Sequence, residues 1–164
     1  NGAEKYKIHR ADHDAKAKKW LSYETIETVE AKTLSYTDKG VTSGEKYKYK
    51  VKAYNGKCKS STKATSTALY VASTKTTVTN KENGINVSWT KVRGAEKYKV
   101  YRMEYDVSAG KWSSAEVITT VSSKTLSYHD KSVEDGRTYK YRVRAIKGKT
   151  YSSYKTTGEI TYTK

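Results

Sequence analysis

The stretch TYKYRVRA, residues 138–145, decides the fold, and KYKYKVKA at residues 46–53 repeats it. Every second residue of the later stretch is apolar or aromatic, and the residues between are Lys140, Arg142 and Arg144. A period of two, with aromatic and β-branched residues on one side and cations on the other, is typical of a half-buried β-strand. Each stretch therefore predicts a strand with an inward apolar face and an outward cationic face.

The two stretches belong to a long internal duplication with an offset of 92 residues. Residues 2–65 align with residues 94–157 without a gap, and 36 of the 64 pairs are identical. A period near 90 residues predicts tandem domains rather than a solenoid of short repeats. We therefore expect a domain in residues 1–72 and a second domain in residues 73–164.

The second copy has seven expected strands, and the first copy has five. Ahead of Gly94 the chain adds a short strand at residues 76–79, a polar turn at residues 80–84, and an alternating strand that contains Ile85, Val87 and Trp89. Nothing comparable precedes Gly2. Further strands are expected at residues 97–103, 117–121, 125–128, 138–145 and 151–163. Seven short strands separated by polar turns predict an all-β, two-sheet sandwich, with the first copy lacking its two N-terminal strands.

Net charge, apolar runs and the cysteine count limit the kinds of protein that this chain can be. The formal net charge is +16, of which residues 1–72 carry +7 and residues 73–164 carry +9, so the charge is a property of the repeat. Such a charge favours solubility and attraction to anionic surfaces. No run approaches the roughly 20 apolar residues of a membrane helix. The single Cys58 predicts a free thiol, since it has no partner for an intrachain disulfide.

Two stretches of the second copy resemble a known domain family. INVSWTKVRGAEKYKVYR at residues 85–102 and TLSYHDKSVEDGRTYKYRVRA at residues 125–145 resemble fibronectin type III domains, especially the Lys- and Tyr-rich tandem domains of secreted and surface proteins of Gram-positive bacteria. The resemblance covers all of residues 73–164 and five of seven strands in residues 2–72. It implies an immunoglobulin-like β-sandwich.

The resemblance also implies roles for particular residues. Trp89 matches the family's Trp on the second strand. Val133 and Tyr139, like Val41 and Tyr47, match the corner in which an apolar residue stands six before a Tyr. In the family that Tyr hydroxyl bonds back to the backbone, which makes these structural residues. The chain departs from many members in having no Pro, and it has no Arg-Gly-Asp motif.

The sequence gives no support for a catalytic, metal or cofactor site. His13 stands between Asp12 and Asp14, but the second copy has Tyr105 at the same place, so a solvated hairpin is the better interpretation. His129 is not part of the repeat, and the recurring Asp38 and Asp130 are expected to cap the following turns. No Ser-His-Asp arrangement, phosphate loop or zinc spacing is present. We expect a protein that is not an enzyme and needs no cofactor.

One surface remains as a candidate site, the outward face of two neighbouring strands. Its residues in the second copy are Lys97, Lys99, Tyr101, Lys140, Arg142 and Arg144, and in the first copy Lys5, Lys7, His9, Lys48, Lys50 and Lys52. Such a face is suited to phosphate-rich wall polymers, sulfated or sialylated glycans or, last among these, nucleic acid without sequence specificity. A solvated face that keeps a flat sheet soluble is the more frequent meaning of exposed Lys.

The leading expectation is a non-catalytic spacer or adhesion module of an extracellular or cell-surface bacterial protein, whose partners are other modules of the same polypeptide. Binding of anionic polymers or glycans through the cationic face is the first alternative. The missing strands raise a second alternative. Residues 1–72 would expose apolar positions such as Tyr6, Ile8, Val51 and Ala53, and an uncovered strand edge favours self-association. Either the chain is a fragment, which we favour, or a neighbouring copy donates the missing strands and builds a filament.

Overall fold

The computed structural model describes residues 2–164, and these form two compact units. Unit 1 ends at Tyr70, and unit 2 is Val71–Lys164. The strands of unit 1 are β1 (Lys5–Asp14), β2 (Lys19–Trp20), β3 (Glu24–Glu30), β4 (Lys46–Asn55), β5 (Cys58–Lys59) and β6 (Ala68–Leu69). The strands of unit 2 are β7 (Thr76–Lys81), β8 (Gly84–Trp89), β9 (Lys97–Asp106), β10 (Lys111–Trp112), β11 (Glu116–Ser122), β12 (Ser127–Asp130), β13 (Thr138–Lys147), β14 (Thr150–Tyr151) and β15 (Ile160–Thr161).

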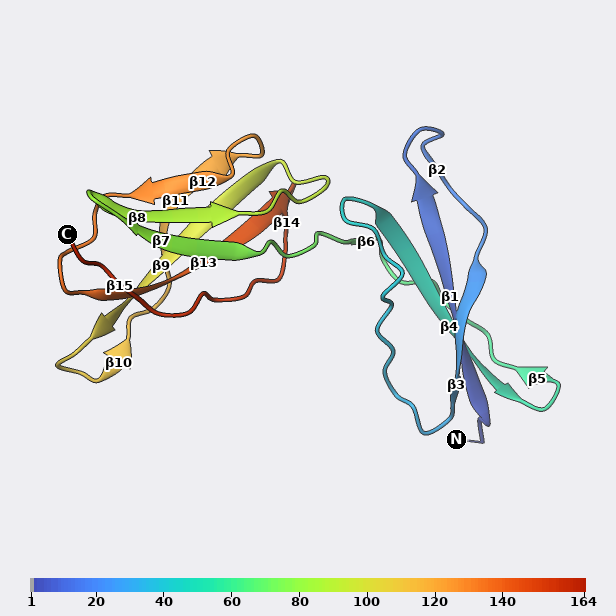
Figure 1. The fold of residues 1–164 in the computed structure, drawn as a ribbon. Helices are drawn as coiled ribbons and strands as arrows, with labels where there is room; N and C mark the ends of the chain where they lie inside the picture. Colours follow the sequence, from blue (N-terminus) through green and yellow to red (C-terminus); the bar gives the residue numbers. More distant parts are fainter. Residues whose placement is uncertain (1) are drawn as a thin grey trace. The chain divides into compact units, whose positions relative to one another are not determined.

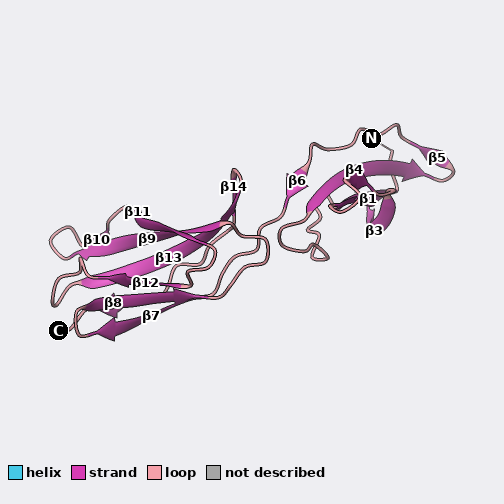
Figure 2. Cartoon of the chain, turned by 90° about the horizontal axis from the view of Figure 1, so that it is seen from above, coloured by secondary structure: helices cyan, strands magenta, loops and turns pink. Residues whose placement is uncertain are grey.

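Unit 2 is a two-layer β-sandwich. One layer has the order β10-β9-β13-β14, with β11 beside β9 and β15 beside β13, and the other layer is β12-β8-β7. Figure 2 shows β9 and β13 in one layer and β7 and β8 in the other. The layers face each other through the alternate residues of their strands, which is how two half-buried sheets make a core. The predicted all-β sandwich is confirmed.

Unit 1 repeats the six-stranded layer of unit 2 without a second layer. Its order is β2-β1-β4-β5, with β3 beside β1 and β6 beside β4. Figure 1 shows β1, β3 and β4 of unit 1 running side by side. Residues 35–38, which correspond to β12, form no strand. Within residues 2–70, therefore, one face of the sheet has no facing sheet, as the sequence predicted.

The central strand β13 has the predicted alternation. Tyr139, Tyr141, Val143 and Ala145 are all at most 1% exposed, whereas Arg142 and Arg144 are half-buried. β13 pairs with β9 in antiparallel register, with Val143 opposite Val100. The core of unit 2 is built from these residues together with Ile85, Val87 and Trp89 of β8.

Several strand bounds differ from the prediction by a few residues, and the differences with a clear physical reason are at the first turn of unit 2 and in its last strand. The predicted turn at residues 80–84 is shorter, because Lys81 pairs with Gly84. The predicted last strand at residues 151–163 is strand at its ends alone, β14 and β15. Between them, Ser152 Oγ accepts the backbone N–H of Ala145 at 3.0 Å, and Thr157 Oγ1 accepts that of Tyr141 at 3.0 Å. Side-chain hydroxyls thus take the place of ladder carbonyls and interrupt the strand.

Among residues 2–164 there is no helix long and apolar enough to cross a membrane.

Candidate functional site

The cationic face predicted from the sequence lies on β9 and β13 of unit 2. The strand register places Arg142 opposite Tyr101 and Arg144 opposite Lys99. Residues directly opposite each other on neighbouring strands share a face of the sheet. The structure therefore brings these residues together on the side of the sheet that faces away from β8.

Aromatic rings hold most of these cations in place. The Arg142 guanidinium carbon lies 4.0 Å from the centre of the Tyr154 ring and 5.0 Å from that of Tyr101. Arg144 lies 5.0 Å from the centre of the Tyr151 ring and 5.5 Å from that of Tyr154. These distances fall within the range of cation–π attraction.

The same arrangement continues to both ends of the face. Lys140 Nζ lies 4.0 Å from the Trp112 ring centre, and Lys99 Nζ lies 5.4 Å from that of Tyr151. We call this set the cation–aromatic ladder: Trp112, Lys140, Tyr101, Arg142, Tyr154, Arg144, Tyr151 and Lys99. The predicted Lys97 is exposed at its edge, opposite the buried Ile146, and is not part of it.

The ladder keeps most of its positive charge unpaired. Lys140 Nζ forms an ion pair with Glu159 at 3.1 Å. Within residues 2–164, no carboxylate pairs with Arg142 or Arg144, and Arg142 Nε is buried without a hydrogen-bond partner. Arg144 Nε donates to Ser152 O at 2.9 Å. A guanidinium has N–H donors in a rigid fork, which suits bidentate contact with the oxygens of a carboxylate or phosphate group.

Unit 1 carries a looser version of the same face. Lys48 Nζ lies 4.5 Å from the Trp20 ring centre, Lys50 Nζ 4.0 Å from that of Tyr23 and Lys7 Nζ 5.1 Å from that of Tyr54. Lys5 and Lys52 share the face, since the register sets Lys5 opposite Tyr54 and Lys7 opposite Lys52. The residues that correspond to Tyr151 and Tyr154 are Lys59 and Thr62. Unit 1 therefore has isolated cation–ring pairs where unit 2 has a continuous ladder.

The pKa of His9 reflects the positive charge of this face in unit 1. Burial of its ring lowers its pKa, and the charges of Lys50, Lys52 and Lys7 lower it further. Its Nδ1 lies 3.0 Å from Thr25 Oγ1. The pKa shift means that the local environment disfavours a further positive charge at this place.

The opposite face of the unit 1 sheet is an open apolar groove of about 640 Å³. The sheet contributes its inward residues, and the segment after β3 contributes the other wall. The lining residues are Tyr6, Ile8, Val29, Thr33, Leu34, Ser35, Tyr36, Thr37, Asp38, Val41, Tyr47, Tyr49, Val51, Ala68, Leu69 and Tyr70. Asp38 is the one charged residue in this set. We call this site the open groove.

Inward side chains of the unit 1 sheet are more exposed than their counterparts in unit 2. Val51 is 51% exposed, whereas its counterpart Val143 is 1% exposed. Leu34 is 89% exposed. The expectation that Ile8 is exposed was wrong, since it is 6% exposed, and Tyr6 and Ala53 are half-buried. The segment after β3 lines the same groove and covers this part of the sheet.

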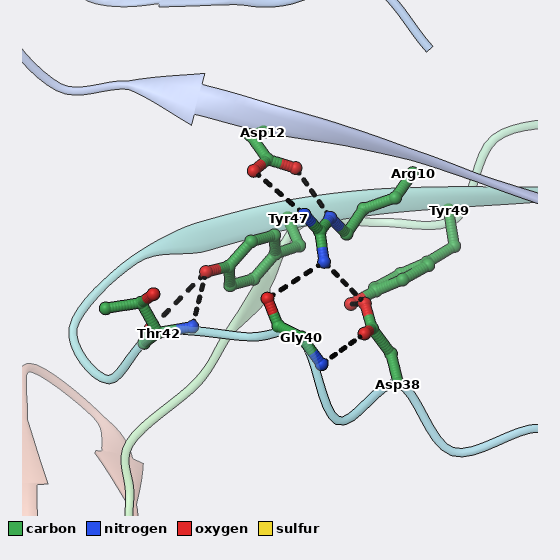
Figure 3. A network of polar contacts seen from close by, with 7 residues as sticks. All are labelled: Arg10, Asp12, Asp38, Gly40, Thr42, Tyr47 and Tyr49. Carbon is green, nitrogen blue, oxygen red and sulfur yellow. Dashed lines mark hydrogen bonds and ion pairs between the residues drawn. The ribbon is translucent and has the colours of Figure 1, made fainter. Parts of the chain in front are cut away.

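A polar network fixes that segment (Figure 3). Arg10 Nη1 donates to Asp38 Oδ2 at 3.0 Å and to Gly40 O at 3.0 Å, and its Nε donates to Asp12 Oδ1 at 2.7 Å. Tyr49 Oη donates to Asp38 Oδ2 at 2.9 Å, and Asp38 Oδ1 accepts the backbone N–H of Gly40. Burial raises the pKa of Tyr49, and the neighbouring Asp38 raises it further.

Unit 2 repeats the network in a more buried form. Arg102 Nη1 lies 3.1 Å from Asp130 Oδ2, and Tyr141 Oη donates to the same oxygen at 2.9 Å. Asp130 is fully buried, and its Oδ1 accepts hydrogen bonds from the Ser132 N–H and hydroxyl. Burial opposes the charged carboxylate, but the hydrogen bonds from Ser132 and Tyr141, together with Arg102, outweigh it and hold the pKa of Asp130 below its ordinary value. Asp130 thus caps its turn and also anchors β12 to β9 and β13.

The residues given structural roles by the family resemblance lie in the core or at the corner. Tyr139 Oη accepts the backbone N–H of Glu134 at 3.0 Å, and Tyr47 Oη accepts that of Thr42 at 2.7 Å. Trp89 is 5% exposed, and its ring centre lies 5.6 Å from that of Tyr98. Val41 and Val133 are both half-buried.

Sequence reasoning missed three of the rings in the ladder and one contact of the hairpin. Trp112 recurs as Trp20, which was the available signal for its place, but Tyr151 and Tyr154 fall in the irregular stretch around β14. His129 breaks the repeat, and its Nε2 lies 3.0 Å from Asn83 O, in the turn between β7 and β8. The residue that differs is therefore one that contacts a hairpin found in unit 2 alone among the described residues.

The structure shows the surroundings of His13 and of Cys58. His13 packs edge-on against Trp20, with ring centres 5.0 Å apart. Across residues 2–164, no group of three or more His, Cys, Asp or Glu side chains is arranged to hold a metal ion. Cys58 is a free, exposed thiol.

Comparison with known proteins identifies the fold. Residues 73–161 match the family described as the fibronectin type III domain, SaeA third domain. A two-domain fibronectin type III segment of chicken tenascin covers 98% of this chain and 86% of its own, with 18% identity and a TM-score of 0.53. Domains FN1–FN3 of chicken CNTN1 match over 97% of this chain and 57% of theirs, with 21% identity and a TM-score of 0.48. No curated protein sequence matches the chain.

Proposed function

The chain belongs to the fibronectin type III family, and we propose that its two units are non-catalytic spacer and adhesion modules of an extracellular or cell-surface bacterial protein. The observation that carries this proposal is the family match over residues 73–161, joined to a repeat that folds as two compact units. A fold shared by many proteins leaves the function to specific sites, and the candidate sites found in residues 2–164 are surfaces. Other modules of the same polypeptide are the expected partners.

Surface labelling tests this proposal. An antibody against unit 2 should stain intact cells of the source bacterium, and protease added outside the cells should remove the signal. Signal that appears after lysis alone would contradict an extracellular or surface location. The same fractions, probed for a cytoplasmic protein, control for leakage.

The cation–aromatic ladder favours a second function, the binding of anionic polymers. Within residues 2–164, Arg142 and Arg144 pair with no carboxylate, and their guanidinium carbons lie 4.0 Å from the ring centre of Tyr154 and 5.0 Å from that of Tyr151, respectively. Fixing the cations in advance lowers the entropy lost when a polymer binds. Phosphate-rich wall polymers and sulfated or sialylated glycans have the required charge. The rings add apolar surface that sugar faces can contact, so glycans fit better than nucleic acid, for which no groove-reading element is present in residues 2–164.

Matched charge reversals in the two units test this function with heparin as the probe. The unit 2 variant is Lys140→Glu, Arg142→Glu and Arg144→Glu, and the unit 1 variant is Lys48→Glu, Lys50→Glu and Lys52→Glu. Both variants change the net charge by the same amount. We expect the unit 2 variant to lose at least about tenfold more affinity than the unit 1 variant at physiological salt, where distant charges are screened. Equal losses of affinity would show that the ladder is not a specific binding site, and would leave it as a solvated surface.

Assembly of filaments by strand donation is a further prediction from the sequence. The open groove gives the acceptor half of that hypothesis. The donor half needs a hairpin that is free to leave its own unit, whereas β8 is paired with β7 and β12 in unit 2.

A further inference from the structure

Arg142 is the cation of the cation–aromatic ladder with the fewest polar contacts. Its guanidinium carbon lies 4.0 Å from the centre of the Tyr154 ring and 5.0 Å from that of Tyr101, and its Nε is buried without a hydrogen-bond partner. Across residues 2–164, no oxygen accepts a hydrogen bond from any of its nitrogens. Polar groups that a fold buries are nearly always paired, so donors left free on a half-buried guanidinium favour an acceptor from a ligand. The fork of N–H donors suits two oxygens of one anionic group.

The neighbouring cations on β13 set the spacing of further anionic groups. Lys140, Arg142 and Arg144 are half-buried at alternate positions of the strand, between fully buried core residues, and therefore share its outer face. Alternate residues of a strand are separated by six backbone bonds, which span about 7 Å. Lys99 lies opposite Arg144 on β9 and adds a charge at that end. The face thus has a row of cations that repeats about every 7 Å.

We propose that this row binds a linear phosphodiester polymer of a three-carbon polyol, poly(glycerol phosphate), laid along β13. The inference rests on the proposed binding of anionic polymers by unit 2 and names the chemical class of the polymer. In this polymer six single bonds join one phosphorus to the next, as six bonds join alternate residues of a strand. At about 1.2 Å per bond in an extended chain, the phosphates repeat at about 7 Å. Successive phosphates therefore meet successive cations, and their contributions combine in one binding event.

The spacing separates this polymer from other anionic chains. A five-carbon polyol such as ribitol adds two bonds and about 2 Å to each repeat, so its phosphates lose register with the cations. In a glycan, rigid rings separate the linkages, and the charges recur with the length of one or two sugars. Single-stranded nucleic acid has the six-bond repeat, but its bases bind by stacking on open aromatic faces. The Tyr154 ring already has the guanidinium groups of Arg142 and Arg144 within 5.5 Å of its centre.

Glu159 is a competitor for one cation of the row. It forms an ion pair with Lys140 Nζ at 3.1 Å, and its side chain is 62% exposed. An ion pair at such an exposed position contributes little to stability, so a phosphate can displace the carboxylate from Lys140. The displaced carboxylate then stays close to the polymer and repels it. Removing the charge of Glu159 should therefore strengthen polymer binding.

Two synthetic polymers with equal numbers of phosphates test the spacing. Calorimetry with the intact 164-residue chain measures the binding of glycerol phosphate and ribitol phosphate hexamers, with heparin as a third ligand. We expect the glycerol polymer to bind at least about tenfold more tightly than the ribitol polymer, because it alone lets several phosphates bind at once. A hexanucleotide should bind as weakly as the ribitol polymer.

The possible failures of this experiment have different meanings. Equal affinities for the two polyol polymers would overturn the inference about spacing and leave the binding of anionic polymers standing, as would binding of heparin alone. A hexanucleotide that binds as tightly as the glycerol polymer would overturn the choice of a polyol. Absence of binding by all the ligands, heparin included, would contradict the proposed binding function as well.

Three variants of the chain locate the row. Arg142→Lys keeps the charge but removes the fork of donors, and it should weaken binding of the glycerol polymer at least about threefold. Glu159→Gln should strengthen this binding about twofold, because Lys140 loses its competing carboxylate. Glu82→Gln makes the same change of net charge in the turn of the other layer, and it should have no effect. Urea unfolding checks that each variant is folded. Equal effects of the two Glu variants, or full affinity in Arg142→Lys, would contradict the assignment.

Discussion

Unit 1 and unit 2 have the same six-stranded sheet, but among the described residues 2–164 only unit 2 covers it with a second layer. The pairing of β1 with β3 and β4 repeats that of β9 with β11 and β13. The strand register of this sheet is therefore specified by its own alternation and does not need the β7–β8 hairpin. What the hairpin adds is burial. Val143 is 1% exposed in unit 2, and Val51 is 51% exposed in unit 1.

The outward faces of the two units differ in the opposite sense. Unit 2 has two Tyr residues, Tyr151 and Tyr154, that link its cations into one ladder, and unit 1 has Lys59 and Thr62 in their places. The unit with the covered core thus has the more organised outer face. The unit with the looser outer face has the open groove. The comparison places the proposed polymer-binding face in unit 2 and the uncovered apolar groove in unit 1.

The largest expected effect on stability comes from placing a charged side chain on the inward face of the sheet. Val143→Asp would place a carboxylate in a closed core, and it should destabilise unit 2 by about 4 kcal/mol. The matched Val51→Asp lies at a half-exposed position and should change the stability of unit 1 by about 1 kcal/mol or less. Urea unfolding followed by the amide resonances of each unit measures both. Equal losses would mean that the groove of unit 1 is closed in solution.

Gly84→Ala should give the next largest effect, because it would weaken the contact between the β7–β8 hairpin and β12, and unit 1 has no such contact among the described residues. Gly84 has φ +140°, and a Cβ at this position would lie 2.2 Å from Asp130 O. The hairpin must then shift from β12, and we expect unit 2 to lose about 3 kcal/mol while unit 1 is unchanged. The unfolding assay used for Val143→Asp provides the measurement. Unchanged stability of unit 2 would show that the β8–β12 contact contributes little to the sandwich.

Removing the Tyr hydroxyls should sharpen the comparison of the two polar networks. Tyr141→Phe leaves the buried Asp130 carboxylate without one donor and should cost about 2 kcal/mol. Tyr49→Phe acts on Asp38, whose side chain is 10% exposed and can recruit water, so the expected cost is about 1 kcal/mol. Thermal unfolding of the two single variants measures which one loses more stability. A larger loss for Tyr49→Phe would contradict the burial difference.

The smallest predicted effect is a dependence of stability on acid pH. The folded-state pKa of Asp130 lies below the ordinary value of 3.8, so the folded state releases this proton more readily than the unfolded state. The stabilisation is complete above the ordinary pKa and is lost as pH falls through the folded pKa. At pH values below about 4, we expect the free energy of unfolding of unit 2, measured with urea, to decrease with falling pH by at most about 1.4 kcal/mol per pH unit for this group. Asp130→Asn, although less stable at neutral pH, should show a flatter slope, and an unchanged slope would assign the acid sensitivity to other carboxylates.

Much of the fold was predictable because local pattern and tertiary structure agree. The alternation of β13 and the offset of 92 residues gave the sheet and the tandem organisation, and the missing strands of unit 1 followed from the unequal lengths of the copies. The irregular stretch after β14 was not predictable in this way. There Ser152 and Thr157 hydroxyls replace backbone partners, and composition does not distinguish such a stretch from a polar strand.

The candidate surfaces were predictable in part. Period-two alternation placed Lys99, Tyr101, Arg142 and Arg144 on one face. Tyr151 and Tyr154, which also contact the arginines, come from a segment outside that alternation. Asp38 and Asp130 were expected as turn caps, and their ion pairs with Arg10 and Arg102 were missed, since these link residues 28 positions apart. Residues that recur at such separations in both copies are the signal that would have found them.

Amide hydrogen exchange of residues 35–38 and 127–130 tests the central claim most directly, because the two segments are equivalent and differ in having a paired strand. Exchange reports local opening of the backbone. In the chain alone, residues 127–130 should be protected and residues 35–38 should exchange at least about a hundredfold faster. Equal protection of both segments in the chain alone would contradict the open groove and the account built on it.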